Sequence, residues 1–152
     1  MNDVYLETIL LIERLHRRFL DVIKAELDRL KIEDLNNIQT LILYNIGKEE
    51  LTIGELTNRG YYLGSNVSYN IKKMVENNYL EQERAEHDKR SVKIKLSSKG
   101  LDICEKIHSL YARHVEELKK SDEFSTHLSQ VNNSLESLEN FWSQQLTHSY
   151  KH

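Results

Sequence analysis

The chain has no proline, one cysteine and only five glycines among its 152 residues. Proline and glycine are the residues that most often interrupt helices, so their distribution divides the chain. All five glycines lie between Gly47 and Gly100, which leaves residues 1–46 and 101–152 without either helix breaker. Two long flanks of this kind around a punctuated middle argue against a β-sandwich, a collagen-like chain or a disordered tail.

A single cysteine cannot form an internal disulfide, and no apolar run is long enough for a signal peptide or a membrane span. We therefore expect a cytoplasmic protein that does not contact a membrane. A chain of this length buries about 68–70% of the surface exposed by its unfolded form, so stability requires neither a disulfide nor a structural metal. The 39% apolar and 30% charged content is that of one ordinary domain.

The net charge of −3 hides an uneven distribution of charge along the chain. Residues 84–100 carry six basic and two acidic groups, whereas every other part of the chain has an acidic excess. The six basic residues are Arg84, Lys89, Arg90, Lys93, Lys95 and Lys99. A local basic excess suits a polyanionic partner, and the alternative is a charged hairpin exposed to water; charge alone does not decide between them.

Apolar residues recur at steps of three and four along both flanks, which predicts long helices. In residues 5–30 this pattern widens around residues 9–12 until it covers most of the helix circumference, so a second partner must cover that surface. Ser97 is a suitable N-cap for a helix whose stripe runs over residues 101–118. A final stripe over residues 124–142 has nearly heptad spacing, which is typical of a helix that packs against another helix.

Two capping-box pairs in the middle of the chain, Asn36 with Gln39 and Thr52 with Glu55, each predict the start of a helix. The first of these helices ends at Gly47, because glycine readily adopts the backbone conformation that closes a helix. The second is about two turns long, which is short enough to be the first helix of a helix-turn-helix.

A further helix begins at residues 64–65 and ends at residues 77–78, where asparagine suits a left-handed ending. The hydrophobic period then changes, and residues 80–85 and 92–96 predict two strands joined by the basic loop 86–90. Two short helices followed by a hairpin describe a winged helix-turn-helix. The predicted fold class is therefore mainly α with a minor β part.

In a helix-turn-helix the second helix enters the major groove with its N-terminal residues nearest the bases. Here that helix offers polar and basic side chains, namely Ser65, Asn66, Ser68, Tyr69, Asn70, Lys72 and Lys73. Asparagine can pair with adenine N6 and N7, serine can bond to a base or a phosphate, and lysine can neutralise backbone charge. The alternative is an outer helix face exposed to water, as most polar faces are.

The hairpin adds a second set of candidate DNA contacts, namely Arg84, Asp88, Lys89, Arg90 and Lys93. Near the hairpin tip, Arg90 would reach a phosphate or a narrow minor groove. Asp88 would hold the tip in shape and aim the Arg90 guanidinium. The alternative is an exposed ion pair worth less than about 1 kcal/mol.

Three stretches resemble the MarR family of bacterial transcriptional regulators: LTIGELTNRG from Leu51, SNVSYNIKKMVENNYL from Ser65 and, most specifically, DKRSVKIKLSSKG from Asp88. The flank lengths agree as well, so the resemblance covers nearly the whole chain. It implies a homodimer, a pseudo-palindromic operator and repression that is relieved by a small molecule or an oxidant. The effector would bind in a crevice between the dimerisation helices and the DNA-binding lobe.

The same resemblance implies a division of the chain. Residues 1–152 form a single domain, in which residues 1–33 and 101–152 are dimerisation helices and residues 34–100 are the winged helix-turn-helix lobe that binds DNA. Within the family, residues 60–70 are similar to an alphaproteobacterial group that includes the L,D-transpeptidase regulator LdtR.

The chain departs from the family pattern at three positions. Asn78 and Ser97 replace a usual glycine and a usual threonine, which are chemically mild changes. Tyr69 stands where many members have a basic residue. Since the helix then lacks an arginine near its start, the commonest contact with guanine is lost, and we expect operator half-sites rich in A·T pairs.

For the effector crevice we expect a lining of aromatic and small polar side chains, namely His16, Phe19, Thr40, Tyr44, Cys104 and Tyr111. Aromatic residues at helical spacing are more often part of a core, which is the alternative for this set. Cys104 is either an inert buried thiol or a redox sensor.

Motifs of catalysis and cofactor binding are absent from the sequence. It contains no glycine-rich phosphate loop, His-Glu-x-x-His, Cys-x-x-Cys or Gly-x-Ser-x-Gly. His108 and His114 are too far apart around a helix to share a metal without other ligands, so no metal or cofactor is expected. We therefore expect a DNA-binding transcriptional regulator and no enzyme. The alternative is a winged-helix module that binds an acidic protein partner without specific DNA binding.

Overall fold

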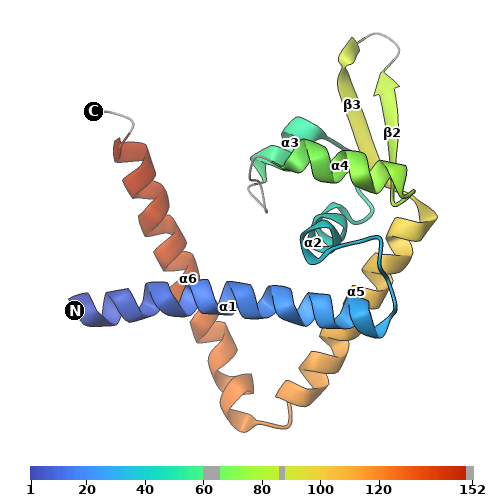
Figure 1. Cartoon of the computed structure of the whole chain (residues 1–152). Coiled ribbons are helices and arrows are strands. Elements are labelled where there is room, and N and C mark those ends of the chain that lie inside the picture. The colour runs from blue at the N-terminus through green and yellow to red at the C-terminus, as the bar shows by residue number, and fades with distance from the viewer. Residues whose placement is uncertain (60–65, 86–87, 150–152) are drawn as a thin grey trace. The chain divides into compact units, whose positions relative to one another are not determined.

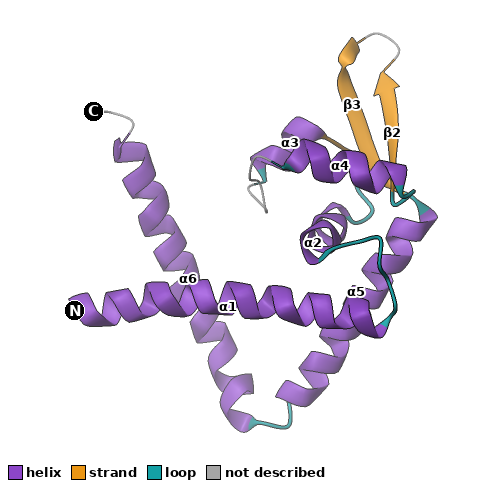
Figure 2. Cartoon of the chain, viewed as in Figure 1, coloured by secondary structure: helices purple, strands orange, loops and turns teal. Residues whose placement is uncertain are grey.

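The computed structural model describes residues 1–59, 66–85 and 88–149 (Figure 1). The elements in these ranges are α1 (Asn2–Arg29), α2 (Asn37–Ile46), β1 (Leu51–Thr52), α3 (Ile53–Asn58), α4 (Val67–Glu76), β2 (Leu80–Ala85), β3 (Asp88–Leu96), α5 (Ser98–Leu118) and α6 (Asp122–Ser149). Helices predominate and the strands are confined to one small sheet, which confirms the predicted fold class (Figure 2). Across the described ranges, no helix combines the length and apolarity needed to cross a bilayer.

The chain divides into two compact units, Met1–Leu110 and Tyr111–His152. The first unit holds α1 to α4, the sheet and most of α5. The second holds the end of α5 and the whole of α6.

The sheet of the first unit has three antiparallel strands in the order β1-β3-β2. The long strand β3 pairs with β2 over the whole of β2, and Leu51 of β1 lies opposite Ile94 on its other edge. The sequence did not predict β1, because two residues are too few to show a strand period. The observed β2 has the bounds predicted for the first hairpin strand.

The predicted loop at residues 86–90 is too long. The observed β3 starts at Asp88, so the backbone of residues 88–90 continues the strand. A register irregularity between Arg84 and Ala85 makes this possible, because it places Ala85 opposite Asp88. An irregularity of this kind adds local twist and lets pairing continue close to the hairpin tip.

The core of the first unit takes residues from every helix and from the sheet. Its largest fully buried side chains are Ile23, Thr40, Ile42, Leu43, Ile46, Leu56, Ile71, Met74, Ile94 and Ile107. The C-terminal half of α1 packs against α2 and buries Ile23 and Leu27, whereas the N-terminal half leaves Leu6, Leu10 and Leu15 exposed. The widened apolar surface around residues 9–12 lies in the N-terminal half, where Leu10 and Leu11 stay exposed in the described chain.

The predicted starts of α2 and α3 and the predicted end of α4 are confirmed, whereas α4 begins at Val67 with Asn66 at its N-cap, later than the start predicted at residues 64–65. At the start of α2 the Asn36 side chain accepts from the Gln39 N–H at 2.8 Å, and the Gln39 side chain accepts from the Asn36 N–H at 3.1 Å. The Thr52 hydroxyl accepts from the Glu55 N–H at 3.0 Å at the start of α3. Asn78 has a φ of 66°, the left-handed conformation expected after α4.

Ser97 caps α5 as predicted and also fastens it to the end of α4. Its hydroxyl accepts from the Gly100 N–H at 3.1 Å and donates to the carbonyl oxygens of Asn78 and Tyr79 at 2.6 and 3.1 Å. A Cβ atom on Gly100 would stand 2.4 Å from the Tyr79 carbonyl oxygen. The close approach of the two backbones therefore requires glycine at this position.

Candidate nucleic-acid interface

The predicted recognition helix, α4, has one buried and one exposed face. Ile71 and Met74 are buried and attach the helix to the first unit, where it contacts β2 of the hairpin (Figure 1). The exposed face carries most of the predicted DNA contacts, namely Asn66, Ser68, Tyr69, Lys72 and Lys73. Ser65 lies outside the described residues. The arrangement leaves a polar helix face open beside a two-stranded ribbon.

Tyr69 and Lys73 form a local pair on the exposed face of α4. The Lys73 ammonium lies 6.0 Å from the centroid of the Tyr69 ring, at the limit of a cation–π contact, and 3.8 Å from the Glu76 carboxylate. These exposed contacts are weak, so they leave Lys73 able to turn towards a phosphate.

Asn70 differs from its neighbours because it is half-buried and tied to α2. Its side-chain oxygen Oδ1 accepts a hydrogen bond from Nε2 of Gln39 at 3.2 Å. Gln39 is itself buried and is the residue whose Oε1 completes the cap of α2. The spacing of Gln39 from Asn36 predicts only a capping residue, and no local spacing signals the contact of Gln39 with a residue 31 positions away.

The hairpin contributes fewer unengaged cations than its sequence suggests. Lys93 lies opposite Glu83 in the strand register, and Lys95 approaches the Glu81 carboxylate at 3.8 Å. Since the partners in an antiparallel pair share a face, these four charges lie together on one face of the hairpin. Acidic residues of β2 therefore offset two of the six basic groups counted in residues 84–100.

Arg84 lies opposite Val92, on the face of the hairpin other than that of Lys93. The structure therefore does not bring Arg84 and Lys93 together on one face. Asp88, Lys89 and Arg90 belong to β3 by their backbone, but their side chains lie outside what the structure describes. The predicted pairing of Asp88 with Arg90 stays a prediction.

A cluster of polar residues holds the C-terminal end of α4, and the sequence analysis did not find it. The Tyr79 hydroxyl donates to Oδ1 of Asp34 at 2.5 Å, and the Lys99 ammonium donates to Oδ2 of Asp34 at 3.2 Å and to the Asn77 carbonyl oxygen at 2.9 Å. The Asn77 amide in turn donates to the backbone carbonyl of Asp34 at 3.1 Å. The cluster joins the α1–α2 loop, the end of α4 and the start of α5.

The electrostatics of the cluster favour a charged carboxylate at Asp34. The hydrogen bond from Tyr79 lowers the pKa of the Asp34 carboxyl below its usual value, Lys99 lowers it further, and partial burial opposes both. Burial and the neighbouring Asp34 raise the pKa of the Tyr79 hydroxyl, which remains a donor. Lys99, the last of the six basic residues of the 84–100 segment, is thereby engaged within the fold.

Two of the predicted effector-binding residues, Tyr44 and Cys104, line one cavity of about 300 Å³ between α2 and α5. The lining residues are Tyr44, Gly47, Lys48, Leu101, Cys104, Glu105 and His108. Thr40 is not among them, since it is fully buried and its hydroxyl donates to the Asn36 carbonyl oxygen at 2.8 Å. His16 and Phe19 are not among them either, and Tyr111 belongs to the second unit.

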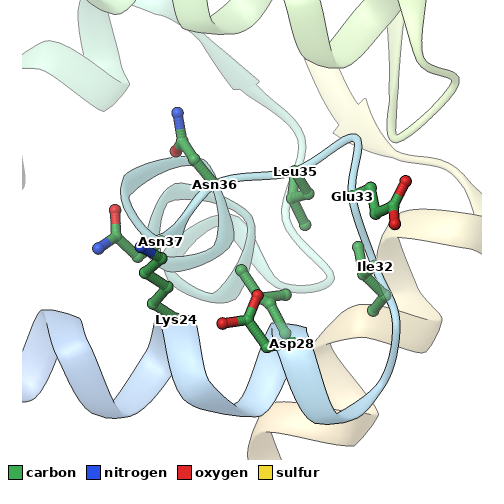
Figure 3. Close-up of a pocket in the computed structure, with 8 residues that line it drawn as sticks. Lys24, Asp28, Ile32, Glu33, Leu35, Asn36 and Asn37 are labelled. Carbon is green, nitrogen blue, oxygen red and sulfur yellow. The ribbon is translucent and has the colours of Figure 1, made fainter.

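A second cavity, of about 530 Å³, lies at the turn from α1 to α2 (Figure 3). Its lining is Lys24, Leu27, Asp28, Ile32, Glu33, Leu35, Asn36 and Asn37. The close-up shows Lys24 of α1 reaching towards Asn37 at the start of α2 (Figure 3). No sequence motif marks this cavity, because its lining comes from a helix end, a loop and a helix start.

Cys104 is partly buried, and its thiol donates to the Leu43 carbonyl oxygen at 3.4 Å. Burial, with a smaller contribution from Glu105, raises the pKa of the thiol to about 11. A thiol of this kind is almost fully protonated near neutral pH, which favours the inert alternative over redox sensing. In the part of the chain that the structure describes, no group of three or more His, Cys, Asp or Glu residues could hold a metal ion.

Comparisons with known proteins agree with this architecture. A model of the MarR family matches residues 33–91. The exopolysaccharide II synthesis transcriptional activator ExpG of Rhizobium meliloti (strain 1021) is 36% identical over 138 residues, which are 91% of this chain and 71% of ExpG. The match includes both flanks as well as the central lobe.

Solved structures show the same fold. FabT of Streptococcus pneumoniae, crystallised in complex with DNA, superposes with a TM-score of 0.74 at 19% identity, covering 93% of this chain and 99% of FabT. The reduced form of MarR from E. coli superposes with a TM-score of 0.67 at 21% identity, covering 82% of this chain and 93% of that structure. At these identities the likeness establishes the winged-helix fold.

Proposed function

Because the chain belongs to the MarR family of winged-helix transcriptional regulators, we propose that it controls transcription as a homodimer bound to a pseudo-palindromic DNA operator. The observation that carries this proposal is α4, which is anchored by Ile71 and Met74 and leaves a polar outer face open beside the β2–β3 hairpin. That is the placement from which a helix reads the major groove while a ribbon reaches the adjacent backbone. Such a regulator acts in the cytoplasm, where its DNA is.

Two exposed apolar stripes support the homodimer. On the N-terminal half of α1, Val4, Leu11 and Leu15 lie on one side of the helix and are 63%, 42% and 63% exposed. Exposed apolar residues also follow α6 at steps of four and three, namely Phe124, Leu128, Val131 and Leu135. Contiguous apolar surface of this kind marks an interaction site, and near-heptad spacing fits a second helix.

We assign dimerisation to residues 1–33 and 101–152 and DNA binding to residues 34–100. The boundary within α1 is gradual, since Ile23 and Leu27 pack into the first unit while the start of the helix stays exposed. The helix α1 would therefore belong to both the dimerisation part and the DNA-binding part. A change in the contacts of its N-terminal half would then alter the packing of α1 against α2.

We also propose that the signal is a small molecule. The cavity next to Tyr44 and Cys104 offers an aromatic ring, apolar surface and the polar groups of Lys48 and His108, which is the mixture that small-molecule sites use. Oxidation of Cys104 is the less favoured signal, because the raised pKa of its thiol keeps the reactive thiolate scarce. A ligand would act by favouring a conformation that does not match the operator.

The test is selection of genomic fragments by the purified protein, followed by binding measurements at several salt concentrations. We expect one motif with two half-sites about 34 Å apart, rich in A·T pairs, and affinity that falls steeply as salt rises. Binding no tighter than to random DNA would overturn the proposal and leave the alternative, a module for an acidic protein partner. Strongly G·C-rich half-sites would contradict the expectation based on Tyr69.

A reporter gene behind the selected operator then gives the direction of control. The family resemblance implies repression, whereas ExpG is named as an activator. Screening small molecules for release of the bound operator identifies the effector class.

A further inference from the structure

We propose that Gln39 fixes the polarity of the Asn70 side-chain amide, so that the recognition helix presents Asn70 to DNA as a hydrogen-bond donor. This inference rests on the proposed function, since it concerns how α4 reads an operator. It assigns a specificity-determining role to a buried residue of α2 that does not itself reach the DNA.

The geometry is a relay of two side-chain hydrogen bonds that begins at a backbone group. The Asn36 N–H donates to Oε1 of Gln39 at 3.1 Å. At the other side of the same amide, Nε2 of Gln39 donates to Oδ1 of Asn70 at 3.2 Å. Gln39 is 7% exposed, so water has little access to replace either bond.

The direction of each bond follows from the first one. A backbone N–H can only donate, so the Gln39 atom that faces Asn36 must be the oxygen. The other terminal atom of Gln39 is then its nitrogen, which can only donate, and the Asn70 atom that faces it must be the oxygen. The Asn70 amide is therefore held with its oxygen towards α2, which leaves its NH₂ group for the side away from Gln39.

This polarity narrows what Asn70 can read. Facing the bases, its NH₂ group donates to an acceptor, namely O6 or N7 of guanine or O4 of thymine. The bidentate contact with adenine also needs the side-chain oxygen to face the base as an acceptor, and that oxygen is held facing Gln39. Pairing with adenine N6 and N7, which the sequence suggested for asparagine in this helix, is therefore not assigned to Asn70.

The substitution Gln39→Glu tests the relay by reversing it. A glutamate keeps an oxygen for the Asn36 N–H, and Glu is a normal partner in a capping box, so α2 retains its start. Its second carboxylate oxygen can only accept, so Asn70 must turn its NH₂ group inwards and present its oxygen to DNA. We expect the selected base at one position of each half-site to change from guanine or thymine, which offer acceptors, to adenine or cytosine, which offer an amino group. Affinity for the wild-type operator should fall about tenfold.

The matched control is Gln82→Glu, which makes the same chemical change at an exposed position of β2. It should weaken binding uniformly, because it adds a negative charge near DNA, without changing the base preference. An altered preference in Gln39→Glu alone supports the relay. An unchanged preference, or only the uniform loss seen in the control, overturns it. If the wild-type protein itself selects no sequence, the proposed function fails instead.

The variant Asn70→Asp tests the same inference without touching α2. The aspartate still accepts from Gln39 but has no NH₂ group, so the base preference at this position should be lost, as in Asn70→Ala. A preference kept in Asn70→Asp but lost in Asn70→Ala would show that the outward group is an acceptor and would overturn the proposal. Circular dichroism and melting curves of each variant distinguish a loss of fold from a loss of sequence recognition by a folded protein.

Discussion

Asp34 is the residue at which three segments far apart in the sequence meet. Its carboxylate binds the Tyr79 hydroxyl and the Lys99 ammonium, and that ammonium lies 4.2 Å from the centroid of the Tyr79 ring. The end of the recognition helix is thereby fastened to the α1–α2 loop by charge-assisted hydrogen bonds, which are stronger than neutral ones. The recognition helix is held at its C-terminal end here and at its middle by Gln39.

The lowered pKa of Asp34 makes the stability of this junction depend on pH. A carboxyl whose pKa is lower in the folded than in the unfolded protein stabilises the fold above its unfolded value, near 3.9, and the effect is lost as pH falls through the folded value. We expect Asp34→Asn to lower the free energy of unfolding by about 1 kcal/mol at pH 7, since the group is partly exposed. Urea titrations at pH 7 and pH 3 measure this, and a difference between variants that is as large at pH 3 as at pH 7 would contradict it.

Position 100 requires glycine because there is no room for a Cβ atom, and not because the backbone conformation there demands glycine. A Cβ atom there would meet the Tyr79 carbonyl oxygen at 2.4 Å, and this oxygen already accepts from the N–H and the hydroxyl of Ser97. We expect Gly100→Ala to lower the free energy of unfolding by about 2 kcal/mol, because the start of α5 must move away from the end of α4.

Gly54 provides the control for this prediction. Outside its own helix backbone and chain neighbours, the nearest atom that a Cβ atom at Gly54 would meet is the Thr52 hydroxyl oxygen at 3.8 Å, and the residue lies inside α3. Gly54→Ala should be neutral or stabilise by up to about 1 kcal/mol, because alanine favours helix. Thermal melts of Gly100→Ala and Gly54→Ala measure the two changes in stability. Equal changes would rule out the close approach of the backbones at Gly100 as the cause of any destabilisation.

The Cys104 thiol should react with thiol reagents more slowly than an exposed cysteine does. With its pKa raised to about 11, only a small fraction of the thiol is ionised at pH 7.5. We expect the folded protein to react with a thiol reagent at least about tenfold more slowly than the protein in urea, and the rate to rise with pH. Peroxide should leave operator binding unchanged. Rapid labelling at pH 7.5, or release of DNA by peroxide, would restore the redox-sensing alternative.

At the scale of elements, the hairpin shows why a charge count along the sequence overstates the charge offered to DNA. Lys95 is close to Glu81, Lys93 lies opposite Glu83, and Lys99 is bound to Asp34. Three of the six basic residues in the 84–100 segment therefore have acidic neighbours in the structure. We therefore propose that the contribution of the hairpin to DNA binding falls mainly to Arg84 and to the basic residues near its tip.

This arrangement predicts different effects for two basic residues of β3. Arg90→Ala should weaken binding to all DNA sequences and reduce the slope of log affinity against log salt by about one, through the loss of one phosphate or minor-groove contact. Lys95→Ala should change the slope much less, because Lys95 already lies near Glu81. Fluorescence anisotropy at several salt concentrations measures both. An unchanged affinity and slope in Arg90→Ala would remove that residue from the site.

Elements with local signals were predictable from the sequence, and contacts between elements were not. The cap at Asn36, the stop at Asn78 and the N-cap at Ser97 depend on residues three or four positions apart, which a sequence displays directly. The contact of Gln39 with Asn70 and the cluster around Asp34 depend on tertiary packing over 31 to 65 positions. The assignment to the LdtR group rests largely on residues outside the described ranges and stays a prediction.

At the scale of the whole molecule, the two flanks without helix breakers form α1, α2, α6 and most of α5. Both α1 and α6 carry apolar stripes that the described fold leaves exposed. Such surface is costly for an isolated chain in water, because burial of each large apolar side chain is worth about 1.5–3 kcal/mol. We propose a second copy of the chain as the partner, because it offers two matching stripes at once, as a symmetric dimer requires.

The stripe on α6 therefore predicts how one charge would affect assembly and DNA binding together. Val131 lies in the stripe, and Asn133, two positions on, lies at an exposed position outside it. We expect Val131→Glu to raise the dimer dissociation constant at least about 100-fold, because a charge would be buried in an apolar interface, and Asn133→Glu to leave it unchanged. Operator binding should weaken in parallel, since a single lobe loses the gain from two linked half-sites. Sedimentation and anisotropy from micromolar to nanomolar protein measure both effects. A wild-type protein that dissociates freely at nanomolar concentration, or a Val131→Glu dimer of normal strength, would contradict the assignment of these flanks.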